Sequence, residues 1–259
     1  MSDIKRVFSK GKAFIPFITV ADPDIETSKE IIRAMAEEGA SLIELGIPFS
    51  DPMAEGPVIQ EANQRGLMAG VSSDDVFEMV QSLRVEGIDV PLAIMTYANV
   101  VFSYGTEAFL SRMEKAGFCA LILPDVPYEE KDEFSFVAES HGIALISLIA
   151  PTSDERIRMI AADATGFIYC VSSLGVTGVR KSFSSNIGQM IDSVRSVRPD
   201  IPVAIGFGIS DEESAKAMAS LSDGVIIGSA IVRIIAEYGK DSPDHVRSFV
   251  RRIIKAIRE

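Results

Sequence analysis

Residues 202–231 have the sequence PVAIGFGISDEESAKAMASLSDGVIIGSAI, in which two short apolar segments flank a more polar one. The apolar segments, Pro202–Phe207 and Gly224–Ile227, are almost continuously hydrophobic, as expected of strands that are buried on both faces. The segment between them, Glu212–Ser220, has the spacing of an amphipathic helix. A strand, a helix and a second strand in this order predict a parallel βαβ unit.

The same alternation extends along the rest of the chain. Six further apolar segments are predicted to be strands: Ala13–Val20, Leu42–Ile47, Pro91–Tyr97, Ala120–Pro124, Ala144–Ala150 and Phe167–Val171. Further helical patterns are Glu26–Glu38, Ser73–Val85, Glu107–Lys115, Glu129–Ser140, Asp154–Ala162, Asn186–Val197, Ala230–Glu237 and Asp244–Ile257. No linker or low-complexity segment divides the chain.

Eight strands in 259 residues give about 32 residues for each strand–helix unit. This spacing predicts an α/β fold, a (β/α)8 TIM barrel formed as one domain by residues 1–259. Extra helices are expected near the N-terminus and after the eighth strand. A doubly wound open sheet is the alternative, and the absence of a GxGxxG motif after the first strand disfavours it.

Charge and composition exclude several classes of function. Lys and Arg number 25 against 37 Asp and Glu, so the net charge is −12. Such a chain repels nucleic acid and anionic lipid. Two cysteines and two histidines, with no CxxC motif, predict neither a disulfide framework nor a metal site. Without a signal peptide or an 18-residue apolar run, the sequence predicts a cytoplasmic protein that does not enter membranes.

The second predicted strand and the loop after it, LIELGIPFSDPMAEGP at residues 42–57, contain two candidate catalytic carboxylates. By alternation, Glu44 shares one strand face with Leu42 and Gly46. A carboxylate that points into a barrel is costly unless it is paired or neutralised, so we interpret Glu44 as a general acid and base with a raised pKa. The alternative is a structural ion pair or a carboxylate that faces the helices. Glu55, in the loop, is either a second proton-handling group or a solvated residue.

Glycine-rich segments follow the last two predicted strands. Gly208 lies after one strand, and Gly228 and Ser229 lie after the other. Many barrel enzymes bind phosphate with these two loops and a helix N-terminus, and Gly178 is a candidate for a third loop. The alternative is close packing around glycines. The segment from Ser172 to about Asn186 is long for such a connection, which predicts a mobile lid or else a disordered loop.

Together these features predict a barrel enzyme that acts on a phosphorylated small molecule by carboxylate acid–base chemistry. Phe17, Met95 and Tyr169 are apolar or aromatic residues on predicted strands. They are interpreted as the lining for a flat hydrophobic part of the ligand, the alternative being ordinary core residues.

At these motifs the chain resembles the tryptophan synthase alpha subunit family, from about Phe14 to Ile257. The shared pattern comprises, in order, PFITVADPD, LIELGIPFSDPMAEGPVIQ, YANVVF, PDVP, LGVTG, GFGIS and IGSAIV. The resemblance implies a retro-aldol cleavage of indole-3-glycerol phosphate to indole and glyceraldehyde 3-phosphate.

The resemblance also implies roles for individual residues. Glu44 matches the acid/base residue that protonates the indole ring at C3, and Tyr169 matches a tyrosine near it. Glu55 stands where the family usually has Asp, a carboxylate that hydrogen-bonds the indole N–H. Phe17 and Met95 match the indole pocket, with Met95 where Leu is expected. Thr177 matches a lid threonine. The residues that match the phosphate loops are Gly178, Gly208, Gly228 and Ser229. Ala21 stands where Gly is commoner in the family.

The family works as an α2β2 complex, which implies a tryptophan synthase beta subunit as partner. That subunit carries pyridoxal phosphate, so no cofactor is expected in this chain. Free alpha subunits of the family are poorly active and docking activates them. The resemblance places the docking contacts at Pro48, Asp51, Asn99, Phe102 and Pro127.

Two alternative functions remain from the sequence. One is a non-catalytic subunit that only activates the beta subunit, because Glu55 replaces the usual Asp. The other is a different phosphate-binding barrel enzyme. An indole-glycerol-phosphate synthase would need a lysine on an inward strand, and the predicted strands contain none. A phosphosugar epimerase would need metal ligands.

Overall fold

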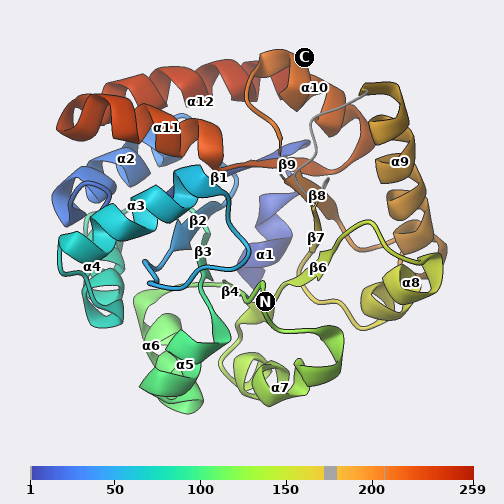
Figure 1. Cartoon of the computed structure of the whole chain (residues 1–259), viewed down its shortest axis with the longest axis horizontal. Coiled ribbons are helices and arrows are strands. Elements are labelled where there is room, and N and C mark those ends of the chain that lie inside the picture. The colour runs from blue at the N-terminus through green and yellow to red at the C-terminus, as the bar shows by residue number, and fades with distance from the viewer. Residues whose placement is uncertain (1, 172–179, 207) are drawn as a thin grey trace.

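The computed structural model describes residues 2–171, 180–206 and 208–259, and it shows a barrel of parallel strands surrounded by helices (Figure 1). Within these residues the sheet order is β5-β4-β3-β2-β1-β9-β8-β7-β6, and every pair of neighbouring strands is parallel. The strands are β1 (Ala13–Thr19), β2 (Ile43–Gly46), β3 (Leu92–Met95), β4 (Ala120–Ile122), β5 (Ala144–Leu145), β6 (Ser147–Ile149), β7 (Ile168–Val171), β8 (Val203–Gly206) and β9 (Gly224–Ile227). The predicted (β/α)8 barrel is confirmed.

The fifth predicted strand, Ala144–Ala150, differs from the prediction because it is divided into β5 and β6. Strand β5 pairs with β4, whereas β6 pairs with β7. Between them, the amide of Ile146 donates to the carbonyl of Leu121 at 2.9 Å. The chain therefore changes its pairing partner within one barrel position, and the two short strands together occupy the place of the fifth strand.

The helices surround the strands as the α/β pattern requires. They are α1 (Ser2–Val7), α2 (Ile25–Glu37), α3 (Pro57–Met68), α4 (Ser73–Val85), α5 (Ala98–Tyr104), α6 (Thr106–Ala116), α7 (Asp132–Ser140), α8 (Asp154–Ala162), α9 (Arg180–Val197), α10 (Glu212–Leu221), α11 (Ser229–Tyr238) and α12 (Ser242–Arg258), with 3-10 helices η1 (Tyr128–Glu130) and η2 (Gly239–Asp241). No helix in the described ranges is long and apolar enough to span a bilayer.

Three helical features differ from the predictions. Helix α3 was not predicted, because it buries only Ala62, Asn63 and Gly66 and so lacks an apolar face. Helix α5 has seven residues, fewer than a periodic pattern needs to be detected. Helix α9 begins at Arg180, so the segment expected to be a loop as far as Asn186 is helical in its second half.

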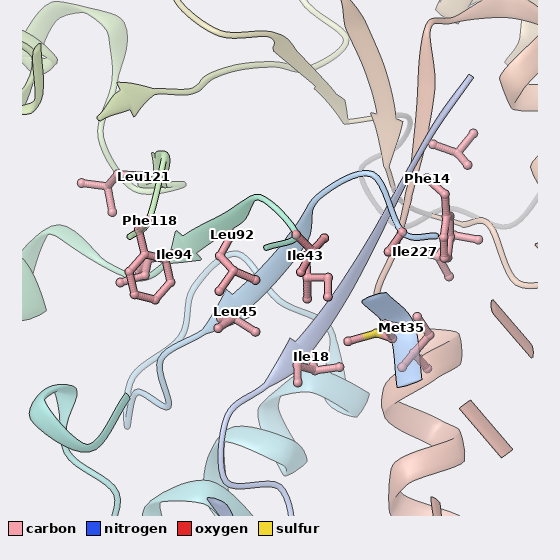
Figure 2. Packing of buried hydrophobic residues seen from close by; sticks show 14 of the residues in the cluster. Phe14, Ile18, Met35, Ile43, Leu45, Leu92, Ile94, Phe118, Leu121 and Ile227 are labelled. Atoms are coloured by element: carbon pink, nitrogen blue, oxygen red, sulfur yellow. The ribbon is translucent and has the colours of Figure 1, made fainter. Parts of the chain in front are cut away.

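The hydrophobic core has two layers, one on each side of the strands. Outward side chains such as Phe14 and Ile18 pack against the helices, where Met35 of α2 meets them (Figure 2). Inward side chains such as Ile15 and Leu42 fill the barrel together with Ile4 from α1. Figure 1 shows α1 in the middle of the ring of strands. Helix α1 thus helps to fill the barrel, which leaves the carboxyl ends of the strands for a ligand.

Outside the barrel, the surface carries a histidine held between two carboxylates. His141, at the end of α7, lies with Nδ1 2.7 Å from Glu114 and Nε2 2.9 Å from Glu107, both on α6. These two hydrogen bonds raise the pKa of His141 above its ordinary value of 6.5. When His141 is protonated, both of its ring nitrogens donate hydrogen bonds to α6, and these bonds connect α7 to α6.

We predict that these two hydrogen bonds of His141 make the stability of the folded chain depend on pH. Since the folded-state pKa is raised, the stabilisation is complete below the ordinary pKa of histidine and is lost as pH rises through the folded-state value. Thermal unfolding of the His141→Gln variant should show a melting temperature lowered at pH 5.5 and close to that of the unchanged chain at pH 9. A loss of equal size at both pH values would contradict this. The double variant Glu107→Gln and Glu114→Gln is the control, because in it His141→Gln should have little effect at either pH.

Candidate active site

Glu44 is the carboxylate that the barrel encloses. Strand β2 directs it inward between Leu42 and Gly46, and its side chain is only 1% exposed. Neither carboxylate oxygen has a hydrogen-bond partner among the described residues. Burial, and to a smaller extent the negative charge of Glu55, raise the pKa of Glu44 to about 8. At neutral pH this group is therefore mostly protonated and able to donate a proton.

Tyr169 lies on the inner face of β7, across the barrel mouth from β2. It is buried, and this burial together with the charge of Glu44 raises the pKa of its hydroxyl, which keeps the phenol neutral. Gly206 on the neighbouring strand β8 leaves the space that the ring occupies, because a Cβ at Gly206 would lie 2.6 Å from the Tyr169 hydroxyl oxygen. The sequence prediction that places Tyr169 near Glu44 agrees with this arrangement.

Glu55 is held by Tyr97, a residue that the sequence analysis did not single out. The Tyr97 hydroxyl donates to the carboxylate of Glu55 and accepts from the amide of Ala54 at 2.9 Å. The ring of Phe49 stacks on that of Tyr97 with 5.0 Å between centroids. Ala93 and Met95 point into the barrel. Continuing this alternation by two residues predicts that Tyr97 also points inward, and this pattern could have identified it from the sequence.

The environment of Glu55 also changes its protonation. Burial is the main cause that raises its pKa, the charge of Asp125 adds to this, and the hydrogen bond from Tyr97 opposes both. Asp125 follows β4, and its carboxylate accepts from the amide of Ala98 at the start of α5 at 3.1 Å. Glu44 and Glu55 thus share one site in different surroundings, one without a partner and one held by a phenol.

An apolar cluster of side chains lies beside Glu44. Phe17 of β1 is paired in register with Glu44, and it packs with Met95, with Ala62 of α3 and with Val232 of α11. Glycines make room for the Phe17 ring: a Cβ at Gly46 would lie 2.7 Å from its Cζ, and one at Gly228 would lie 3.1 Å from its Cδ1. The predicted pocket residues Phe17 and Met95 are therefore brought together.

The predicted phosphate loops lie side by side, because β8 and β9 are neighbours. Gly208 has a φ of +74°, a left-handed conformation that favours glycine. Gly228 precedes Ser229, the first residue of α11, and no side chain in the described part of the chain caps this helix. The free amides and the positive end of the helix dipole suit an anion. Thr177 and Gly178, predicted for the lid and a third loop, lie outside the described residues.

Four of the five predicted docking residues are exposed. These are Asp51, Asn99, Phe102 and Pro127. Pro48 differs from the expectation: it is buried beside α3, where a Cβ at Gly66 would lie 2.6 Å from its Cγ. Pro48 therefore supports the position of α3 and offers no side-chain surface to a partner in this state.

Comparison with known proteins identifies the family to which this arrangement belongs. A family model described as tryptophan synthase alpha chain matches residues 4–257. The chain belongs to the tryptophan synthase alpha chain family.

Individual relatives agree with this assignment. The tryptophan synthase alpha chain of Lacticaseibacillus casei is 46% identical over 257 residues, which is 99% of this chain and 96% of that protein. Among solved structures, tryptophan synthase subunit alpha from Legionella pneumophila is 35% identical with a TM-score of 0.90, covering 100% and 99% of the two chains. A chain of tryptophan synthase from M. tuberculosis has 29% identity and a TM-score of 0.88, covering 99% of each chain.

We predict that Glu44→Gln stabilises the folded chain at alkaline pH. The unfolded chain releases the Glu44 proton near its ordinary pKa of 4.5, whereas the folded chain retains it up to about pH 8, so the wild-type carboxyl reduces stability as pH rises between these values. Glutamine does not titrate. At pH 9 the variant should gain on the order of 4 kcal/mol in unfolding free energy relative to pH 4.5.

Urea unfolding of both chains at pH 4.5, 7 and 9 measures this difference. The same stability difference at all three pH values would show that Glu44 titrates normally in the folded chain. Asp51→Asn is a matched control, because Asp51 is exposed and its neutral isostere removes a charge without opening the core.

Proposed function

We propose that this chain cleaves indole-3-glycerol phosphate to indole and glyceraldehyde 3-phosphate, with Glu44 as the acid/base residue. The observation that carries the proposal is a buried carboxyl group without a partner among the described residues, with its pKa raised to about 8. It lies in the barrel next to an apolar cluster of side chains, and β1 alone separates its strand from the proposed phosphate loop after β9. Membership of the alpha chain family supports the same reaction.

The proposed reaction returns Glu44 to its starting state. Its carboxyl group donates a proton to C3 of the indole ring, which places positive charge on the ring nitrogen. The resulting carboxylate takes the proton from the hydroxyl on the adjacent chain carbon. The bond between C3 and that carbon then breaks, its electron pair restores the indole ring, and the carbon becomes the aldehyde of glyceraldehyde 3-phosphate.

Glu55 is proposed to accept a hydrogen bond from the indole N–H, where positive charge develops. The Tyr97 hydroxyl fixes one end of its carboxylate, which restricts a side chain that is one methylene longer than Asp. Preorganised acceptors of this kind stabilise the transition state without reorganisation. Phe17, Met95 and Tyr169 are proposed to bind the indole ring, and Gly208, Gly228 and Ser229 the phosphate, with Thr177 and Gly178 completing the site.

The chain is also proposed to act in the cytoplasm, in an α2β2 complex with a tryptophan synthase beta subunit that holds pyridoxal phosphate and receives indole. Phe102 supports this docking surface because it is 49% exposed while its ring rests on Phe134, with 4.8 Å between centroids. Asp51, Asn99 and Pro127 are the other exposed residues of the proposed surface, in which Phe102 is the aromatic anchor.

Indole release from indole-3-glycerol phosphate tests the reaction, measured with and without a beta subunit. The unchanged chain should release indole, faster with the beta subunit. Glu44→Gln should lower kcat by about 100-fold to 10,000-fold, the usual contribution of a general acid and base. Glu55→Gln should also lower kcat, because an amide cannot balance the charge on the ring nitrogen.

Two outcomes would contradict these roles. Stimulation of the beta subunit without indole release would make the chain a non-catalytic activating subunit, and an unchanged rate in Glu55→Gln would remove Glu55 from the mechanism. Circular dichroism of each variant confirms that the fold is retained.

A substitution at Phe102 tests the docking surface. Phe102→Asp should weaken binding to the beta subunit at least about tenfold, since truncating an anchor residue commonly costs more than 1 kcal/mol. Phe136→Asp is the matched control, because Phe136 is also exposed, on α7, outside this surface. Equal effects of the two substitutions in a calorimetric titration would argue against the proposed surface.

A further inference from the structure

Thr19 is a buried polar residue at the barrel mouth to which neither the sequence motifs nor the proposed reaction assign a role. It ends β1, its side chain is 1% exposed, and its hydroxyl has no hydrogen-bond partner among the described residues. On β1, Ile15 and Phe17 belong to the inward clusters, whereas Phe14 and Ile18 pack outward. By alternation Thr19 is therefore inward, one layer above Phe17.

The register places this hydroxyl close to the catalytic carboxyl group. Phe17 is paired with Glu44, and Thr19 is paired with Gly46. The unpartnered groups of Thr19 and Glu44 thus lie on the inner faces of adjacent strands, in successive layers. A buried hydroxyl without a partner destabilises the fold, so such groups in native proteins call for an explanation. A ligand that brings its own hydrogen-bonding group supplies one.

The order of the strands shows which part of a ligand would meet Thr19. Strand β1 lies between β9 and β2. The loop with Gly228 and Ser229 follows β9, and Glu44 is on β2. A substrate with its phosphate at that loop and its reacting carbon at Glu44 must extend across the end of β1. In indole-3-glycerol phosphate this connecting part is a three-carbon chain with two hydroxyl groups.

We propose that the Thr19 hydroxyl binds a hydroxyl group of this chain and so orients the scissile bond against Glu44. The proposal rests on the proposed function and adds a substrate-binding residue to it. It explains why β1 ends with a threonine, although its unpartnered hydroxyl lowers the stability of the chain without ligand. It also assigns Thr19 a specificity role: the residue favours a hydroxylated chain over a plain alkyl chain between phosphate and ring.

Thr96 provides a matched control within the same chain. It is also buried, at 2% exposure, and its hydroxyl likewise has no partner in the described part of the chain. It follows β3, where Ile94 packs outward and Met95 contacts the inward clusters, so alternation places Thr96 on the helix side of the strands. Both threonines thus bury a hydroxyl group without a partner among the described residues, but of the two only Thr19 faces the site.

Calorimetric titration of the full chain tests the inference with two ligands. These are indole-3-glycerol phosphate and 3-(indol-3-yl)propyl phosphate, which lacks both chain hydroxyls. All chains carry Glu44→Gln so that substrate is not consumed. Thr19→Val should weaken binding of indole-3-glycerol phosphate about tenfold or more, the size of one buried hydrogen bond, and change that of the analogue less than about twofold.

The other variants separate hydrogen bonding from packing. Thr19→Ser keeps the hydroxyl and should retain most of the preference for the hydroxylated ligand. Thr96→Val should leave both affinities unchanged. In thermal unfolding without ligand, both valine variants should be at least as stable as their parent, because each replaces an unpartnered hydroxyl with a methyl group.

The possible failures can be told apart. Equal weakening of both ligands by Thr19→Val, or no weakening, overturns the inference while leaving the proposed function intact. If the unchanged chain neither cleaves nor binds indole-3-glycerol phosphate, the proposed function fails, and the role of Thr19 fails with it.

Discussion

The carboxyl group of Glu44 is enclosed by the barrel without a hydrogen-bond partner among the described residues, and the chemistry of the site depends on this constraint. Strand β2 must direct residue 44 inward, because the residues on either side of it pack outward against the helices. Burial then penalises the charged form, and the nearby negative charge of Glu55 adds to the penalty. The protein thereby keeps a proton donor at neutral pH, and stability at alkaline pH is reduced as a consequence.

Glycines in the barrel leave the volume that two aromatic rings occupy. Phe17 occupies volume that side chains at Gly46 and Gly228 would fill, and Tyr169 does the same above Gly206. These contacts link β1 to β2 and to the start of α11, and β7 to β8, and both rings are carried by strands. In the proposed reaction these rings hold the indole in one orientation relative to Glu44, which proton transfer to a single carbon requires.

Alternation and spacing were sufficient to predict the barrel, the inward orientation of Glu44 and the adjacent glycine-containing loops after β8 and β9, because each depends on local pattern. Phosphate binding by these loops stays a prediction. They could not predict that the fifth strand changes partner at Ile146, since that depends on the registers of β4 and β7. Helix α3 was missed because its buried face is small and partly polar. Tyr97 and Thr19 were missed for another reason. The importance of Tyr97 depends on its hydrogen bond to Glu55, and that of Thr19 on its having no partner among the described residues, and neither can be read from residue types.

Direct titration of Glu44 tests this account more closely than any rate measurement. Carbon-13 NMR of a chain with labelled glutamate side-chain carboxyls, compared with the same spectrum of Glu44→Gln, assigns the resonance of this one group. Its chemical shift should change with a midpoint near pH 8, well above the ordinary glutamate pKa of 4.5. A midpoint near pH 4.5 would show that the group is ionised at neutral pH, and Glu44 could not then be the proton donor.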